Sequence, residues 1–246
     1  MKNFLKKILP ELILLKYRGY KKHKRIRSYR NNGVECPICN STFKSFESYG
    51  IVKRENARCY TCGSLERHRL LWKYFNEELE YFKKGPKGMV LHFAPEKVLY
   101  DFFDRFKDVD YIPCDLFPEN YQFQGKSITQ KVDITKIPFE NDYFDFIICN
   151  HVLEHIPDDK SAMSELFRVM KKGGQGIFQV PIDINREVTY EDFSITSPQV
   201  REKVFGQNDH VRVYGSDYKN RLEGVGFTVH VDHYIDGFTQ KEIKKY

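Results

Sequence analysis

Four of the six cysteines form two CxxC pairs whose spacing is typical of a metal site. Cys36-Pro-Ile-Cys39 and Cys59-Tyr-Thr-Cys62 are separated by nineteen residues. Thiolates from two tight turns can converge tetrahedrally on Zn²⁺, and this spacing falls in the zinc-ribbon range. The sequence therefore predicts Zn²⁺ bound by Cys36, Cys39, Cys59 and Cys62, with iron or a dithiol redox pair as alternatives. Because four thiolates leave no coordination position open, the predicted role of the zinc is structural.

Polar side chains and short turns follow four segments that are typical of buried strands. The segments MVLHF, VDYIPCDL, KVDI and FDFIICN end near His92, Asp115, Asp133 and Asn150. In an open parallel sheet, ligands bind beyond the carboxyl ends of the strands, where the strand order reverses. The alternative for a single Asp at a strand end is a turn or a helix cap. The candidate binding residues at these ends are His92, Phe93, Ala94, Pro95, Glu96, Asp115, Leu116, Asp133, Ile134, Asn150 and His151.

Residues 131–181 contain the clearest succession of elements that could position these side chains. Two apolar runs, FDFIICN and QGIFQVP, flank a helical pattern that stops at Gly173-Gly174. Such a strand–helix–strand unit, with strands too apolar to alternate, indicates a parallel sheet buried on both faces. GFTVHVDHY, near the C-terminus, is predicted as a sixth strand. We therefore expect an α/β fold: a Rossmann-like, doubly wound, mostly parallel sheet of six or seven strands, preceded by a small zinc-ribbon module.

The order of these parts resembles class I S-adenosylmethionine-dependent methyltransferases, specifically the small-molecule kind known as methyltransferase type 11. An acidic residue, Asp133, ends one strand, an IPF turn follows, and then come FDFI, NHVLEH and a helix closing in RVMKKGG. The phrases CGSLERHRLLW and DHVRVYG also resemble zinc-ribbon-bearing methyltransferases from bacterial sugar and surface-polysaccharide gene contexts. The resemblance covers roughly residues 34–235. It implies S-adenosylmethionine as cofactor and methyl transfer as the activity.

The resemblance also implies a role for each strand end. Asp115 would accept hydrogen bonds from the ribose hydroxyls, and Asp133 from the adenine amino group. The backbone N–H of Ile134 would donate to the adenine ring. Asn150 and His151 would face the methionine portion and its sulfonium.

The first turn departs from the glycine-rich pattern that this family usually has after its first strand. It reads LHFAPEK and contains no glycine. The small Ala94 and the turn-forming Pro95 are expected to preserve a close approach of the backbone to the cofactor. Glu96 is expected to replace the missing carboxylate.

Methyl transfer from a sulfonium is an in-line displacement on an activated methyl group, so positioning carries much of the rate. A general base is needed only when the acceptor is a hydroxyl or a protonated amine. The candidate catalytic residues are His151, after the fourth strand, and His210, in the loop QNDHVRVYG. His155 follows in the same predicted helix as His151 and fits a capping or core histidine equally well. The expected acceptor is an oxygen or nitrogen of a sugar or another small metabolite.

Basic residues are concentrated in an N-terminal arm. Residues 1–30 hold eleven Lys or Arg and one Glu, leaving 29 basic and 33 acidic residues in the rest of the chain. The mildly acidic body gives no indication of a nucleic-acid track. Residues 1–16 place apolar side chains at helical spacing before the polybasic run KKHKRIR. This arm is expected to contact an anionic membrane surface, RNA phosphates, or another protein surface.

The predicted domains are a basic amphipathic arm (1–32), a zinc ribbon (33–65), a linking helix (66–85) and a methyltransferase domain (86–246). The apolar run ILPELILL is short and interrupted by Pro10 and Glu11, so neither a signal peptide nor a spanning helix is expected. The CxxC pairs indicate a reducing compartment. We expect a cytoplasmic protein, which the arm could attach peripherally to the inner face of the membrane.

Two other functions remain open. The chain could be an RNA methyltransferase, because one family of ribosomal RNA guanine methyltransferases also joins a four-ligand zinc module to this fold, and the basic arm fits RNA. The glycine-free first turn would instead fit a non-catalytic binding or scaffold protein on a degenerate methyltransferase fold. Such a protein would have no affinity for S-adenosylmethionine.

Overall fold

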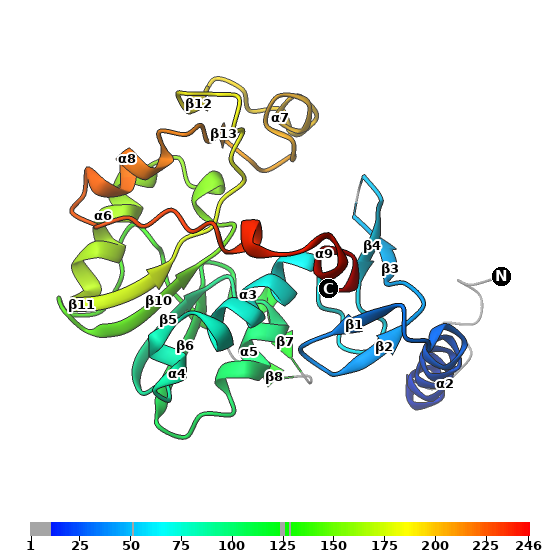
Figure 1. Cartoon of the computed structure of the whole chain (residues 1–246). Helices are drawn as coiled ribbons and strands as arrows, with labels where there is room; N and C mark the ends of the chain where they lie inside the picture. Colours follow the sequence, from blue (N-terminus) through cyan, green and yellow to red (C-terminus); the bar gives the residue numbers. More distant parts are fainter. Residues whose placement is uncertain (1–10, 51, 124–125, 128) are drawn as a thin grey trace. The chain divides into compact units, whose positions relative to one another are not determined.

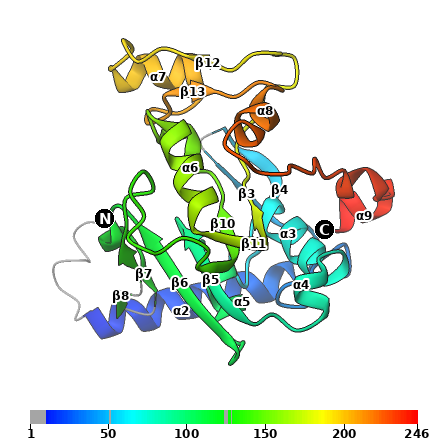
Figure 2. The same cartoon turned by 90° about the vertical axis from the view of Figure 1, so that its left-hand side faces the viewer.

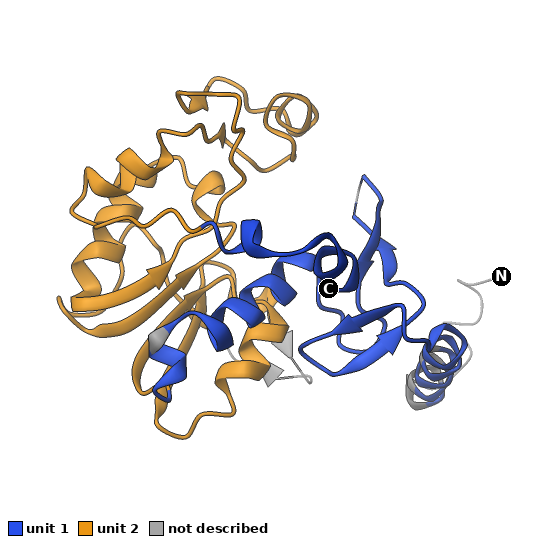
Figure 3. Ribbon diagram, viewed as in Figure 1, with its two compact units in different colours: residues 1–85, 233–246 blue, residues 86–232 orange. Residues whose placement is uncertain are grey.

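The computed structural model describes residues 11–50, 52–123, 126–127 and 129–246. The chain divides into two compact units (Figure 3): a ribbon unit of residues 1–85 with 233–246, and a sheet unit of residues 86–232. Residues 233–246, expected in the methyltransferase domain, thus group with the ribbon unit. The first ten residues of the predicted amphipathic helix lie outside the described residues. Within the described ranges, no helix is long and apolar enough to cross a membrane.

The ribbon unit combines short antiparallel hairpins with helices (Figure 1). Its elements are α2 (Glu11–Tyr29), β1 (Val34–Cys36) paired with β2 (Ser41–Phe43), β3 (Glu47–Tyr49) paired with β4 (Arg54–Arg58), α3 (Glu66–Glu77), α4 (Glu80–Lys83), the 3₁₀ turn Tyr234–Gly237 and α9 (Gln240–Lys245). Phe43, Phe46 and Tyr60 pack with Cys36 and Cys59 in a small buried cluster. A core of this size is marginal by itself, and the zinc predicted from the four cysteines would add to its stability.

The sheet unit is built on a five-stranded parallel sheet with the strand order β11-β10-β5-β6-β9. Its strands are β5 (Gly88–Phe93), β6 (Val109–Asp115), β9 (Gln130–Lys131), β10 (Phe144–Cys149) and β11 (Met170–Ile177). β6 and β9 lie on one side of β5, whereas β10 and β11 lie on the other. The predicted doubly wound α/β arrangement is therefore confirmed, with the reversal of strand order between β5 and β10.

The remaining elements of the sheet unit are helices, 3₁₀ turns and two short hairpins. They are α5 (Lys97–Phe103), α6 (Asp159–Val169), α7 (Pro198–Phe205), α8 (Tyr218–Glu223), the 3₁₀ turns Pro118–Asn120 and Leu153–His155, β7 (Gln122–Phe123) paired with β8 (Lys126–Ser127), and β12 (Tyr190–Glu191) paired with β13 (Arg212–Val213).

Neighbouring residues of β5 face opposite sides of the sheet, as strand geometry requires. Leu91 and Phe93 belong to the buried cluster that contains Leu166 of α6. His92 instead meets the ring of Phe103 in α5, with 6.4 Å between the ring centroids. Helices α5 and α6 therefore cover opposite faces, and α6 is the one in front of the sheet in Figure 2. The central strands β5 and β10 are buried on both sides, which explains their continuous apolar sequences.

Local sequence determines where α6 begins and which face it buries. Asp158 caps the helix, because its carboxylate accepts hydrogen bonds from the backbone N–H (3.0 Å) and the hydroxyl (2.6 Å) of Ser161. The buried residues of α6 recur at helical spacing: Asp159, Ala162, Met163, Leu166 and Val169. Burial of an apolar side chain as large as Leu166 contributes about 1.5–3 kcal/mol.

The sheet is smaller than predicted. Among the described residues it has five strands rather than six or seven, and the predicted sixth strand at residues 226–234 is wrong, since that segment is irregular. Phe227 and Val229 do pack against the buried cluster. An extended segment can bury alternate side chains without pairing with a strand. The alternating apolar residues of GFTVHVDHY therefore indicated packing, but not strand pairing.

The segment after β10 also differs from the prediction. Residues 151–158 were expected to begin a long helix, but they form a 3₁₀ turn at Leu153–His155, and α6 starts only at Asp159. Pro157 explains the break, because proline lacks an N–H and disfavours helical geometry in the residue before it. His151 and His155 therefore do not share one face of an α-helix.

Two non-glycine residues adopt left-handed backbone conformations where the strand order reverses. Ala94, after β5, has φ +49°, and His151, after β10, has φ +55°. Residues other than glycine avoid this region at a cost of roughly 1–2 kcal/mol. Such strain persists where the surrounding structure imposes it, and it concentrates at functional sites. Ala94 thus adopts the conformation that a glycine-rich first turn would supply.

The strain at Ala94 can be measured by substitution. Ala94→Gly should leave the unfolding midpoint of the sheet unit unchanged or raise it, because relief of about 1 kcal/mol offsets the added flexibility of the unfolded chain. Ala162→Gly, in the buried helix α6, is the matched control and should lower stability by about 1 kcal/mol or more. Thermal unfolding of the two variants decides the matter. Equal losses in both would contradict strain at Ala94.

Candidate functional site

The strand register brings the predicted binding residues to one edge of the sheet. Phe93 of β5 lies opposite Cys149 of β10 and Cys114 of β6. Ala94, Asn150 and Asp115 are the next residues in each segment, so they follow the sheet side by side. Asp115 in turn lies opposite Lys131 of β9, just before Asp133. The backbone positions of the predicted strand-end residues therefore lie at the carboxyl edge, near the reversal of strand order between β5 and β10, which is where sheets of this kind have their ligand crevice.

The two aspartates are held by their own turns. The Asp115 carboxylate accepts hydrogen bonds from the N–H of Phe117 (2.8 Å) and the hydroxyl of Tyr121 (3.1 Å). One oxygen of Asp133 accepts from the N–H (2.8 Å) and the hydroxyl (2.7 Å) of Thr135. A carboxylate can accept about four hydrogen bonds. The turns therefore orient both groups and leave acceptor capacity for a ligand.

The His92 side chain points away from the crevice. It is fully buried, and its Nδ1 lies 2.7 Å from the hydroxyl of Tyr111. Its Nε2 lies 3.4 Å from a carboxylate oxygen of Glu96, which is the N-cap residue of α5. His92 is thus a buried residue behind the sheet rather than a direct ligand contact. Leu116 and Phe117, at the end of β6, expose 41% and 54% of their surface, which leaves an apolar area beside Asp115.

The segment after β10 carries buried polar groups. Asn150 is 2% exposed, and its carbonyl oxygen accepts from the N–H of Gln179 at 3.3 Å. Its Nδ2 has no hydrogen-bond partner among the described residues. His151 is partly exposed, and its Nδ1 lies 3.4 Å from a carboxylate oxygen of the buried Glu154. Both residues directly follow β10 at the carboxyl edge of the sheet.

His210, a predicted catalytic residue, lies inside the sheet unit. It is buried, and its ring meets that of His155 edge-on with 4.7 Å between centroids. Its Nδ1 lies 3.1 Å from the carbonyl oxygen of Phe205. Burial, with His155 adding to it, lowers the pKa of His210. The structure therefore brings His210 to the loop after β10, which also carries His151.

Arg212, in the phrase DHVRVYG, fastens that loop, and no role was predicted for it. Its guanidinium is 1% exposed and donates to the carbonyl oxygens of Leu153 (2.8 Å), Ile156 (2.5 Å) and Pro157 (2.8 Å), and to Glu191 (2.9 Å). The Tyr214 hydroxyl donates to Asp159 at 2.7 Å. The phrase DHVRVYG thus fixes the turn LEHIPDD. The sequence drew attention to DHVRVYG through its resemblance to other methyltransferases. No spacing rule predicts that this segment binds the turn LEHIPDD.

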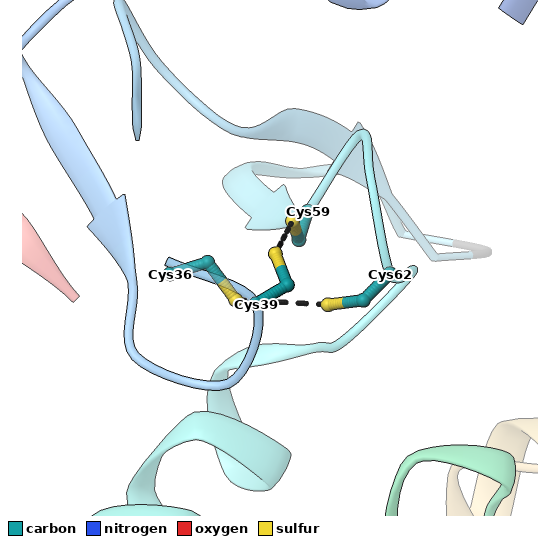
Figure 4. A group of neighbouring side chains, drawn as sticks. All are labelled: Cys36, Cys39, Cys59 and Cys62. Atoms are coloured by element: carbon teal, nitrogen blue, oxygen red, sulfur yellow. Dashed lines mark hydrogen bonds between the residues drawn. The ribbon is translucent and has the colours of Figure 1, made fainter. Parts of the chain in front are cut away.

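The four cysteines of the ribbon unit converge as predicted (Figure 4). The Sγ atoms of Cys36 and Cys62 are 3.6 Å apart, and those of Cys39 and Cys59 are 3.7 Å apart. All four lie within 4.8 Å of one another. A tetrahedral zinc with Zn–S bonds of about 2.3 Å requires sulfur atoms about 3.8 Å apart. The donor set therefore fits Zn²⁺, although no metal is part of the structure.

The two cysteine pairs sit on equivalent turns. The residue after each pair donates its N–H to the carbonyl of the first cysteine: Asn40 to Cys36 at 2.8 Å, and Gly63 to Cys59 at 3.0 Å. Both Asn40 (φ +54°) and Gly63 (φ +78°) are left-handed. Asparagine and glycine tolerate this region best, which explains the residue types at these positions.

The phrase CGSLERHRLLW supplies the surroundings of the cysteine cluster. The Ser64 hydroxyl lies 3.3 Å from Sγ of Cys36 and 3.2 Å from Sγ of Cys62. Arg69 is 1% exposed and donates to the carbonyl oxygens of Ala57 and Ser64, both at 2.9 Å. A buried guanidinium near four thiolates offsets the net negative charge of a Zn(Cys)₄ centre. The sequence analysis did not assign a role to either residue.

The structural-zinc prediction is tested by removing ligands. Cys36→Ser and Cys59→Ser should each lose zinc and unfold the ribbon unit, because zinc contributes about 10 kcal/mol or more to small modules of this kind. Zinc content per chain and far-ultraviolet circular dichroism are the measurements. Cys114→Ser, which alters a buried thiol of β6, is the matched control and should keep its zinc. Unchanged zinc content in both ligand variants would contradict the assignment.

Residues 98–178 match a protein-family model described as a methyltransferase domain. The match runs from α5 through β10 and α6 to the residue after β11, and so it includes the crevice residues Asp115, Asp133, Asn150 and His151. It covers the part of the chain in which the sequence analysis found the family's order of elements.

A curated relative matches a shorter stretch. The demethylmenaquinone methyltransferase of Streptomyces avermitilis is 44% identical over 43 residues, which are 18% of this chain and 19% of that protein. The match therefore spans about a fifth of the relative's length.

Two solved structures are similar at low identity. A putative methyltransferase from Bacillus halodurans is 21% identical, with 64% of this chain and 73% of that chain covered and a TM-score of 0.41. A SAM-dependent methyltransferase from Archaeoglobus fulgidus is 17% identical, with 66% of each chain covered and a TM-score of 0.45. Scores this low do not bear on function. The sequence match over residues 98–178 is to a methyltransferase domain.

Proposed function

We propose that this protein transfers the methyl group of S-adenosylmethionine to an oxygen or nitrogen of a small acceptor such as a sugar. The observation that carries the proposal is the alignment of strand ends at the reversal of strand order between β5 and β10. There, the strand register aligns Ala94, Asp115 and Asn150 within the segment that matches methyltransferases. No ligand is needed to create this arrangement, because the turns after the strands already hold the side chains.

The residues at the crevice fit the cofactor in chemistry and in sequence order. The carboxylates of Asp115 and Asp133 would accept hydrogen bonds from hydroxyl and amino groups of the adenosine. The exposed Leu116 and Phe117 offer apolar area against which a flat ring can pack. The left-handed turn at Ala94 carries only a methyl side chain, so a ligand can approach the backbone closely.

The chain's own contribution to the reaction would be positioning and proton removal. When bound, the cofactor supplies an activated methyl group that an acceptor atom can attack in line. His151 is partly exposed beside the crevice, with Glu154 at 3.4 Å from its Nδ1. An imidazole that is open to an acceptor can take a proton from the acceptor's hydroxyl, and His151 would serve as that base. His210 is buried and is therefore less accessible to an acceptor than His151, so His151 is the better candidate for the base.

The proposal predicts measurable affinity for S-adenosylmethionine and for its product, S-adenosylhomocysteine. In calorimetric titration, Asp115→Ala should weaken binding roughly tenfold to a hundredfold, because hydrogen bonds to a charged group contribute about 1.5–3 kcal/mol. Asp110→Ala changes an exposed aspartate at the opposite end of the same strand and should bind normally. Absence of binding by the folded, zinc-loaded wild type would favour the degenerate scaffold.

A further inference from the structure

We propose that Glu154, His155 and His210 form a second metal site, which binds a divalent transition-metal ion such as Zn²⁺. Each of the three offers one ligand atom, and these atoms lie within 4.8 Å of one another. They come from two segments far apart in the sequence, the 3₁₀ turn after β10 and the loop before β13. Two imidazoles and one carboxylate form a donor set that suits zinc and its first-row neighbours.

Buried groups without hydrogen bonds point to a missing ligand. Glu154 is 2% exposed and His210 is 4% exposed. Neither carboxylate oxygen of Glu154, nor Nε2 of His210, has a hydrogen-bond partner within the described part of the chain. An ionised carboxylate buried in this state costs several kcal/mol unless it is paired or coordinates a metal. A bound cation would satisfy all three atoms at once.

The charged neighbours do not replace a cation. His151 Nδ1 lies 3.4 Å from Glu154, beyond a good hydrogen bond, and its side chain is 36% exposed. Asp209 lies 3.5 Å from Nδ1 of His155 and adds negative charge to the cluster. Arg212 is committed to carbonyl oxygens and to Glu191. Two carboxylates and two imidazoles thus meet in one place.

The surroundings of His210 have the arrangement that metal-binding histidines usually show. Such a histidine donates its other ring N–H to a carbonyl or a carboxylate, which fixes the tautomer and aims the free nitrogen at the metal. His210 Nδ1 lies 3.1 Å from the carbonyl of Phe205. With the proton on Nδ1, the unpartnered Nε2 is the ligand atom. A carboxylate oxygen of Asp209 lies 3.5 Å from Nδ1 of His155, near enough to favour the same orientation there.

The backbone that carries the ligands is fixed before any metal binds. The N–H of Val211 donates to the carbonyl of Glu154 at 3.0 Å, which ties the two segments together next to the ligands. Arg212 holds the carbonyls of residues 153, 156 and 157 from the other side. A preorganised triad of this kind loses little conformational freedom on binding.

Three protein ligands leave coordination positions open, unlike the closed four-cysteine centre. The site follows β10 directly, beside His151 and Asn150. An ion there could bind an oxygen of the methyl acceptor and lower its pKa. This role rests on the proposed methyltransferase function, whereas metal binding itself does not.

Zinc content distinguishes the second site from the ribbon. Protein equilibrated with Zn²⁺ and then dialysed against metal-free buffer should retain one zinc per chain beyond the ion of the ribbon unit. His210→Ala and Glu154→Gln should each lose that additional zinc and keep the ribbon zinc. His230→Ala and Glu223→Gln, which change exposed residues of the same unit, are the matched controls and should keep both.

Two results would overturn the proposal. Wild-type protein that retains zinc only in the ribbon excludes a Zn²⁺ site at this cluster, whether or not the variants fold. Retention of the additional zinc in folded His210→Ala and Glu154→Gln would place it elsewhere. Titration with S-adenosylhomocysteine in parallel separates the two proposals. Normal product binding without the additional zinc refutes only the metal site, and additional zinc without product binding refutes only the methyltransferase.

Discussion

The reversal of strand order between β5 and β10 is the constraint on which the rest of the sheet unit depends. The chain crosses from β5 to β6 in one direction and from β10 to β11 in the other, so α5 and α6 cover opposite faces of the sheet. Neither helix therefore covers the carboxyl ends of β5 and β10. That edge holds the two strained residues, Ala94 and His151. The aligned ends of β6 and β10 add Asp115 and Asn150. Topology, rather than any single motif, therefore assembles the candidate site.

The two phrases that resemble zinc-ribbon methyltransferases perform similar structural tasks in different units. Each contributes one buried arginine that donates to several backbone carbonyls: Arg69 beside the cysteines and Arg212 beside the loop after β10. A guanidinium can satisfy several acceptors from one rigid plane, which lysine cannot do. Each arginine thus fixes a stretch of irregular backbone that carries candidate functional residues.

The sequence predicted the elements that depend on local patterns. The CxxC spacing identified the cysteine cluster, and apolar runs identified β5, β6 and β10 with their polar ends. The predicted strand KVDI overlaps β9 only at Lys131. Patterns that depend on tertiary context were not predictable. The alternation in residues 226–234 reflects packing of Phe227 and Val229 without strand pairing. The meeting of His210 with Glu154 and His155 requires two segments more than fifty residues apart to be fastened by Arg212, and no spacing within either segment encodes it.

Amide hydrogen exchange with and without S-adenosylhomocysteine tests the central claim most directly, because it locates binding along the backbone. The account predicts slower exchange on binding in residues 94–97, 116–117, 134–135 and 151–152, the turns that follow β5, β6, β9 and β10. Exchange in the hairpins of the ribbon unit should not change. Binding that leaves these four turns unprotected, or that protects the ribbon unit instead, would contradict a cofactor site at the carboxyl edge of the sheet.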